Sequence, residues 1–152
     1  SRKKLLKSIR EIEALKPEII EDNFSDFDLL IELNKKAFGE KSLFYKPYKI
    51  ESYHDFFKLD FDIHMLSYIV NRKKEAVSFS VKYKDIYNFI NAGTNKIDVP
   101  NLGTFNVYKN LEKAIQLGSK KFDAGLEDLG WKERWHLDKI PRYFFIKNIT
   151  IT

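Results

Sequence analysis

The chain of 152 residues is the length of one ordinary domain, and 43% hydrophobic residues with 13 Phe and 8 Tyr are enough for a single buried core. It contains no Cys, which excludes a disulfide framework, thiolate metal ligands and a cysteine nucleophile, and no run of about eighteen apolar residues predicts a membrane span. The formal charge is +5, but residues 1–16 hold six Lys or Arg and only two Glu, so the excess is predicted to lie on one terminal helix. That helix is expected to present a solvated face, and the alternative is a phosphate-binding arm that binds RNA.

The N-terminal part is predicted to contain two amphipathic helices with a short strand between them. Apolar side chains recur at helical spacing and predict a first helix at about residues 2–15. Pro17 stops this pattern. A strand is expected at residues 18–21. The second helix is expected to have Ser25 as its N-cap and to end at Gly39. The side chains expected to pack the first helix on the domain or on a neighbouring lobe are Leu5, Ile9 and Ile12.

The middle of the chain changes from helical to strand periodicity. After a loop at residues 40–50, aromatic residues predict a short helix around residues 53–57. Apolar and polar side chains then alternate at residues 66–70 and 76–83, and residues 86–92 are rich in β-branched and aromatic side chains. Because polar turns separate these three segments, an antiparallel meander is expected.

The C-terminal part adds a crossover to this meander. The elements expected are a helix at residues 101–117, a short strand at 121–124, a helical segment at 131–137 and a last strand at 143–146. The short strand is predicted to lie beside the third strand of the meander, with the long helix crossing the sheet between them. The order of elements therefore predicts the α/β class, with one mixed sheet.

Residues 101–135 contain, in order, a helix opened by Gly103, then Phe122, Asp123 and Gly125, and then Trp131 followed by Lys132. This order resembles the end of CelD- and FemAB-type acyltransferases. The resemblance implies the GNAT-like acyl-CoA N-acyltransferase fold for residues 1–152 as a single domain. Together with the start at Ser1, it also implies the C-terminal lobe of a longer, two-lobed protein. The residues that carry the pattern are Gly103, Ala114, Gly118, Phe122, Asp123, Gly125, Trp131 and Lys132.

The same resemblance implies transfer of an acyl group from a thioester or aminoacyl ester donor to an amine or hydroxyl acceptor. The donor is then acyl-coenzyme A or an aminoacyl-tRNA, and tRNA is the one nucleic acid expected as a partner. A companion GNAT lobe is a further expected partner. The rival hypothesis is a catalytically idle GNAT-like lobe that binds a partner or supports an active lobe. The lack of Cys and of a signal sequence favours a cytoplasmic protein.

The turn before the 101–117 helix is the predicted donor-binding site. Asn101, Gly103 and Thr104 can offer backbone N–H groups and the positive end of a helix dipole to a diphosphate. Gly103 also allows a ligand to approach the backbone closely. The alternative is that Asn101 is a cap or turn residue and that Gly103 merely fits the first turn. The loop lacks the Gln/Arg-x-x-Gly-x-Gly/Ala signature of coenzyme A-binding GNAT enzymes.

Three further residues are candidates for catalysis. Asp123, at the end of a short strand, can orient or deprotonate an acceptor amine, or it can bind N–H groups of the following loop. Through the family pattern, Lys132 is a candidate to bind a phosphate or the acyl carbonyl, and otherwise it is a solvated side chain. Tyr108 can protonate a leaving thiolate or pack in the core. The His residues show no metal-ligand spacing, so no metal is expected.

Overall fold

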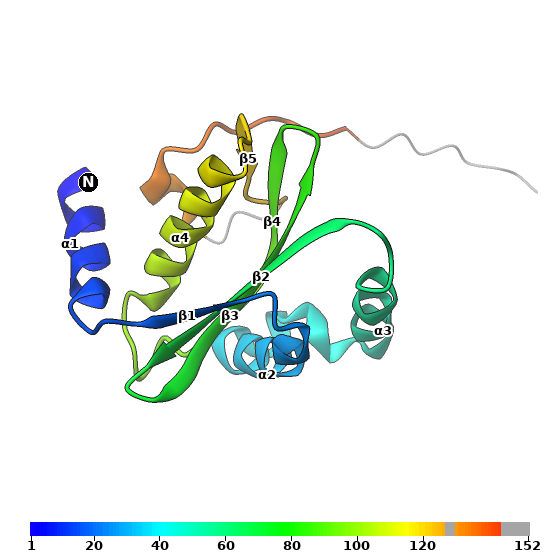
Figure 1. The fold of residues 1–152 in the computed structure, drawn as a ribbon, viewed down its shortest axis with the longest axis horizontal. Helices are drawn as coiled ribbons and strands as arrows, with labels where there is room; N and C mark the ends of the chain where they lie inside the picture. Colours follow the sequence, from blue (N-terminus) through cyan, green and yellow to red (C-terminus); the bar gives the residue numbers. More distant parts are fainter. Residues whose placement is uncertain (127–129, 144–152) are drawn as a thin grey trace, which may run out of the picture.

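The computed structural model describes residues 1–126 and 130–143, and among these residues five strands form one sheet in the order β1-β2-β3-β4-β5 (Figure 1). The strands are β1 (Glu18–Glu21), β2 (Asp62–Val70), β3 (Lys73–Tyr83), β4 (Ile86–Thr94) and β5 (Lys121–Asp123), and the α-helices are α1 (Arg2–Glu13), α2 (Phe27–Phe38), α3 (Pro47–Phe56) and α4 (Leu102–Gln116). Short 3₁₀ helices lie at Phe24–Asp26, Gly39–Lys41, Leu43–Tyr45 and Lys132–Trp135.

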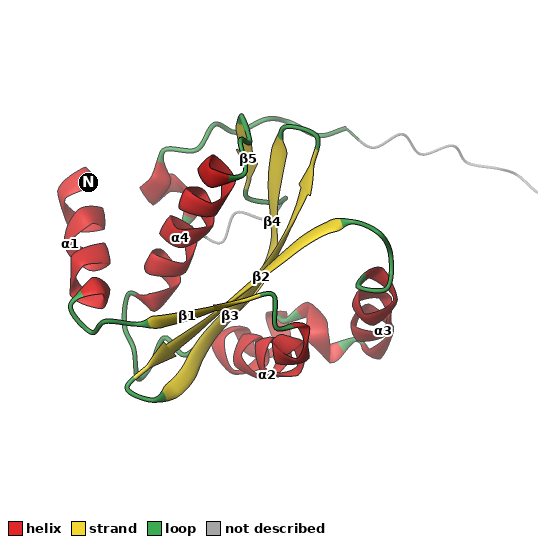
Figure 2. Cartoon of the chain, in the orientation of Figure 1, coloured by secondary structure: helices red, strands yellow, loops and turns green. Residues whose placement is uncertain are grey.

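The sheet is mixed, as predicted. Strands β1 to β4 pair antiparallel with their neighbours in the sheet, and β5 pairs parallel with β4. Helix α4 connects β4 to β5 and crosses one face of the sheet (Figure 2). Strands β3 and β4 are joined by a two-residue turn, in which Lys84 has a φ of 55°. The predicted meander, crossover helix and parallel short strand are therefore confirmed.

Helices cover both faces of the sheet and bury two separate clusters of side chains. Helices α1 and α4 pack on one face, and α2 and α3 pack on the other (Figure 1). Because successive residues of a strand point to opposite faces, β2 and β3 supply both clusters. The α1–α4 cluster holds Ile9, Ile12, Leu66, Tyr68, Val70, Ala76, Val99, Leu102 and Phe105. The α2–α3 cluster holds Phe27, Leu30, Ile31, Phe44, Met65, Val77 and Phe79.

Two helix starts differ from the predictions. Ser25 does not cap α2, because it lies within the 3₁₀ helix that precedes it and its hydroxyl donates to Asn23 Oδ1 (2.7 Å). Helix α2 begins at Phe27 instead. Helix α3 begins at Pro47, inside the segment predicted as a loop. Proline suits the first turn of a helix, where its missing N–H removes no hydrogen bond.

Strand and C-terminal boundaries also differ. Strand β2 starts at Asp62 and β3 at Lys73, because ladder pairing extends both strands through polar residues outside the apolar alternation. The predicted helix at 131–137 is only the 3₁₀ helix Lys132–Trp135. Of the predicted strand at 143–146, Tyr143 is not in a strand, and residues 144–146 lie outside the described residues.

Helix α1 packs its apolar side on the domain, as predicted. Ile9 and Ile12 are buried beside α4, and Leu5 packs on the same cluster. Helix α1 is therefore part of this fold.

Deletion of residues 1–16 should lower the melting temperature by about 10 °C. Each buried Ile contributes about 1.5–3 kcal/mol, and 1 kcal/mol corresponds to about 2–4 °C for a chain of this length. Scanning calorimetry measures the change. Deletion of residues 1–3, which precede the buried side chains, is the control and should leave the melting temperature nearly constant. An unchanged melting temperature after the longer deletion would contradict packing of α1 on the domain.

Candidate functional site

Strands β4 and β5 pair only at their first residues and then part. The parallel pairing runs from Ile86 opposite Lys121 to Asn88 opposite Asp123, where β5 ends, whereas β4 continues to Thr94. In the part of the chain that the structure describes, no strand pairs with this side of β4 beyond Asn88. The outer part of β4 therefore presents backbone donors and acceptors beside the carboxyl end of β5, where open α/β sheets bind ligands.

Strand β4 also carries a bulge in this part. Phe79 of β3 lies opposite Asn91 and Ser80 lies opposite Phe89, so Ile90 is the extra residue. A bulge takes backbone groups out of the ladder and bends the strand, and bulges are frequent next to active sites. The bulge was not predicted from the sequence, because no Gly or Pro marks the position.

The first turn of α4 has free N–H groups. The N–H groups of Leu102 and Phe105 are bonded to carbonyl oxygens of the preceding loop, but those of Gly103 and Thr104 have no acceptor among the described residues. A Cβ added at Gly103 would meet no atom within 4 Å, so the space beside it is open. Free N–H groups at the positive end of a helix dipole fit a phosphate or another anion.

Acidic side chains are bonded to the loop that leads into this turn. Asn101 has a φ of 71° and no cap hydrogen bond, and its Nδ2 donates to Glu11 Oε2 of α1 (2.9 Å). Asn95 Nδ2 donates to Glu75 Oε2 (2.7 Å) and to Asp98 Oδ2 (2.8 Å), and Glu75 is buried. The fit to an anion therefore rests on the backbone of Gly103 and Thr104, and the negative charges of this loop oppose it.

Asp123 and Lys132 meet at the loop that follows β5. Gly125 N–H donates to Asp123 Oδ1 (2.8 Å), and Arg142 forms an ion pair with Asp123 Oδ2. Lys132 Nζ donates to Gly125 O (2.7 Å) and lies 5.8 Å from the centroid of the Trp131 ring. Both candidates thus hold the backbone of Gly125, which has a φ of 79°. Both oxygens of Asp123 therefore already have a partner, and an acceptor has to use a remaining lone pair or displace one of them.

Tyr108 has different surroundings. Its ring packs on the α1–α4 cluster, and Lys109 Nζ lies 5.4 Å from the ring centroid. A hydrogen bond to Glu112, together with burial and the charge of that carboxylate, raises the pKa of Tyr108 to about 12. Burial opposes ionisation of Glu112, but hydrogen bonds from Lys109 and Tyr108 outweigh it and lower the pKa of its carboxyl. The described contacts of Tyr108 do not bring it to Asp123.

A buried polar network that was not predicted from the sequence joins α4 to the sheet. Ser78 and Ser80, which form the polar side of the predicted strand alternation, are buried under α4. The hydroxyls of Ser80 and Tyr87 donate to Asn110 Oδ1 (3.0 and 2.8 Å). Asn110 Nδ2 donates to Ser78 Oγ (3.0 Å) and to Asn106 Oδ1 (2.9 Å). The feature of the sequence that could have indicated this network is a pair of Asn residues four positions apart in the predicted helix, because such residues share one helix face.

His64 is the most enclosed of the three His residues, but no group of metal ligands among the described residues surrounds it. It stacks on Tyr87 with ring centroids 6.3 Å apart, and its Nε2 lies 2.9 Å from Asp62 Oδ1 without hydrogen-bond geometry. Among residues 1–126 and 130–143, no group of three or more His, Asp or Glu side chains is placed to hold a metal ion. In the same residues, no helix is both long and apolar enough to cross a membrane.

No protein-family model and no curated protein matches this chain. Among solved structures, it is similar to a possible acetyltransferase from Clostridium difficile, with a TM-score of 0.60 and 15% identity over 88% of this chain and 98% of that chain. A GNAT family acetyltransferase from Staphylococcus aureus has a TM-score of 0.54 and 15% identity over 88% and 98%. An aminoglycoside N-acetyltransferase in complex with CoA has a TM-score of 0.57 and 6% identity over 87% and 94%. Identities this low concern the fold alone, and the GNAT-type fold predicted from the sequence is confirmed.

Proposed function

We propose that this chain, which has the fold of GNAT acetyltransferases, is an acyltransferase with its donor site between β4, β5 and the first turn of α4. The observation that carries the proposal is that β4 and β5 separate after Asn88, next to the bulge at Ile90. The free N–H groups of Gly103 and Thr104 lie in the same crossover unit. A donor in this gap can bond to the unpaired edge of β4, while its phosphates lie at the start of α4.

The proposed reaction is direct transfer. The amine or hydroxyl of the acceptor attacks the carbonyl carbon of a thioester, the new C–N or C–O bond forms, and the C–S bond breaks. The acceptor loses one proton, and the leaving thiolate takes one up. Such a reaction needs positioning and charge stabilisation rather than a covalent nucleophile, which suits a chain without Cys.

The candidate residues have unequal support for these steps. Gly103 and Thr104 can hold the donor through their backbone, whereas the side chain of Asn101 is already bonded to Glu11. Asp123 is proposed as the group that orients or deprotonates the acceptor, and Lys132 as the cation that holds the loop beside it. Tyr108 is the weakest candidate, because its pKa of about 12 lies far above that of a thiol, about 8.5, so that proton transfer to a thiolate is uphill.

Acyl-coenzyme A is the proposed donor. A structural neighbour binds CoA, and a diphosphate suits the free N–H groups at the start of α4. The resemblance to FemAB-type proteins supports aminoacyl-tRNA as the other donor and a companion lobe as a partner. The absent glycine signature and the acidic side chains around the loop support the second candidate function, an idle GNAT-like lobe that binds a partner.

Acetyl-coenzyme A at about 1 mM should raise the melting temperature of the wild-type chain by about 5–10 °C. A ligand at a hundred times its Kd stabilises the folded state by about 2.7 kcal/mol, and 1 kcal/mol corresponds to about 2–4 °C. The Gly103→Val variant should lose this rise, because a branched side chain fills the open space beside the N–H groups. Lys132→Met should reduce it through the lost charge. Differential scanning fluorimetry measures all three.

Gln116→Val, at the other end of α4, is the matched control for Gly103→Val and should keep the rise. No shift with acetyl-, succinyl- or longer acyl-coenzyme A would contradict this donor. Titration of aminoacylated and of uncharged tRNA then separates the remaining hypotheses, because a FemAB-like transferase prefers the aminoacylated form, whereas an idle lobe does not distinguish the two.

A further inference from the structure

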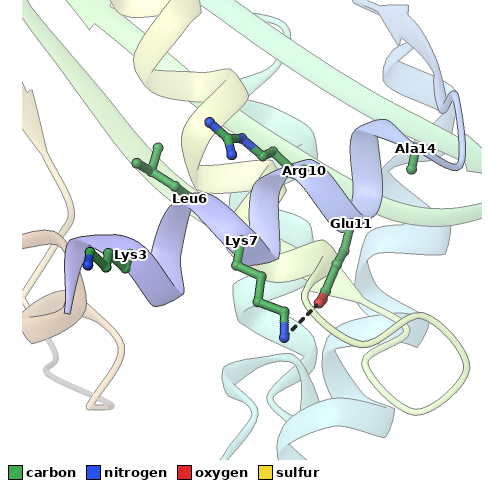
Figure 3. Close-up of a pocket in the computed structure, with 6 residues that line it drawn as sticks. All are labelled: Lys3, Leu6, Lys7, Arg10, Glu11 and Ala14. Atoms are coloured by element: carbon green, nitrogen blue, oxygen red, sulfur yellow. Dashed lines mark ion pairs between the residues drawn. The ribbon is translucent and has the colours of Figure 1, made fainter.

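The segment that contains α1 carries most of the excess charge of the chain. Residues 1–16 contain six Lys or Arg and two Glu, and the whole chain has a formal charge of +5. Bases recur along one side of the helix at positions three and four residues apart, which is the spacing of a single helix face. A shallow concavity runs along this basic face and is lined by Lys3, Leu6, Lys7, Arg10, Glu11 and Ala14 (Figure 3).

The bases of this face are available to a ligand. Lys3, Lys7 and Arg10 are exposed, and within the described residues neither Lys3 nor Arg10 takes part in an ion pair. Lys7 Nζ lies 3.9 Å from Glu11 Oε1, at the long end of ion-pair distances. The other oxygen of Glu11 accepts from Asn101, which ties this carboxylate to the domain. One Glu against three bases leaves the face positive.

The other side of α1 determines which kind of ligand this face fits. A basic helix that binds a membrane, or that docks in an apolar groove of another protein, inserts its own apolar side. In α1 that side is already buried, because Leu5, Ile9 and Ile12 pack on the domain. Among the residues that line the concavity, Leu6 is the one large apolar side chain, and it is 42% exposed. The groups that this face offers to a ligand are therefore mainly cationic side chains.

We propose that the basic face of α1 binds the phosphate backbone of a nucleic acid. From Lys3 to Arg10 the helix rises about 10 Å, the length of about three nucleotides of one strand at 3.4 Å each. No aromatic side chain lines the concavity to stack on a base, so binding is independent of base sequence. The inference rests on charge and packing and does not depend on the acyltransferase proposal.

Fluorescence anisotropy with labelled single-stranded RNA and DNA of mixed sequence tests this inference. Three phosphate contacts give a slope of log K against log salt of about −2, so affinity should fall about 20-fold between 50 and 200 mM salt. RNA and DNA should bind alike, because phosphate contacts do not read the 2′-hydroxyl. The triple variant Lys3→Gln, Lys7→Gln, Arg10→Gln should lose most of this affinity and most of the slope.

The matched control is the triple variant Lys36→Gln, Lys41→Gln, Lys46→Gln, which removes the same charge from exposed positions around α2 and should bind like the wild type. Circular dichroism checks that both variants fold, and Gln preserves helix propensity. An equal loss of affinity in both variants would mean that only the net charge of the protein matters, and it would overturn the assignment to α1. The absence of RNA and DNA binding at 50 mM salt would also overturn it, as would binding to vesicles of anionic lipid without binding to either nucleic acid.

Discussion

The Gly93→Val substitution is expected to lower the free energy of unfolding by about 3 kcal/mol or more. At this position α2 packs directly on the backbone of β4. An added Cβ would lie 2.4 Å from the carbonyl oxygen of Leu30, 2.8 Å from Leu33 Cβ and 2.9 Å from the N atom of Asn34. Two of these atoms belong to the backbone of α2, so the whole helix has to move away from the sheet.

Movement of α2 would break further contacts. Asn34 Nδ2 donates to Ala92 O (2.7 Å) and to Asn91 Oδ1 (3.1 Å), and its Oδ1 accepts from Ser42 (2.7 Å). Urea unfolding followed by circular dichroism measures the loss. Gly103→Ala is the matched control, because its Cβ meets open space and a Gly-to-Ala change in a helix is neutral or stabilising by up to about 1 kcal/mol. Equal midpoints for Gly93→Val and the wild type would rule out this close packing.

Asn110→Leu is the second substitution with a large expected effect, a loss of about 3 kcal/mol. Asn110 Oδ1 is the acceptor for the hydroxyls of Ser80 and Tyr87, and the change leaves both hydroxyls buried without that acceptor. Each buried, unsatisfied polar group costs about 1–3 kcal/mol. Burial, partly offset by a hydrogen bond with Ser80, also raises the pKa of the Tyr87 hydroxyl to about 12.

A thermodynamic cycle separates this loss from a simple cavity or packing effect. Tyr87→Phe alone should cost about 1 kcal/mol, because Ser80 still donates to Asn110. The combination of Asn110→Leu with Ser80→Ala and Tyr87→Phe should be more stable than the sum of the single losses predicts, since no hydroxyl is left unpaired. Unfolding midpoints in urea provide the values. Strict additivity would mean that the network contributes nothing beyond its separate parts.

Local features of the sequence were sufficient to predict most of the elements. The meander followed from alternation and from the two-residue turn that contains Lys84, and the end of α4 followed from Gly118, which has a φ of 72°. The parallel strand β5 followed from a segment too short for a helix after a long helix, because right-handed crossovers are nearly universal. Helix starts were less predictable, since the sequence around Ser25 suits both a cap and the 3₁₀ helix that forms there.

The candidate site was predictable only in part. Gly103 and Thr104 could be recognised from their position at the start of a helix, whose first N–H groups lack intrahelical acceptors. The pairing of Asp123 with Arg142 and the bond between Asn101 and Glu11 join residues 19 and 90 positions apart. No periodicity or spacing reports such contacts, because they depend on which loops the fold brings together.

The sequence by itself determined the α/β class, the order of the elements and the crossover, because these follow from local periodicity, turn residues and chirality. The tertiary structure decided where polar residues go. Ser78 and Ser80 alternate with apolar residues like the solvent side of a strand, yet they are buried under α4 and paired with its Asn side chains. Alternation shows that the two faces of a strand differ, but only the packing of helices from distant segments decides whether the polar face meets water or a buried partner.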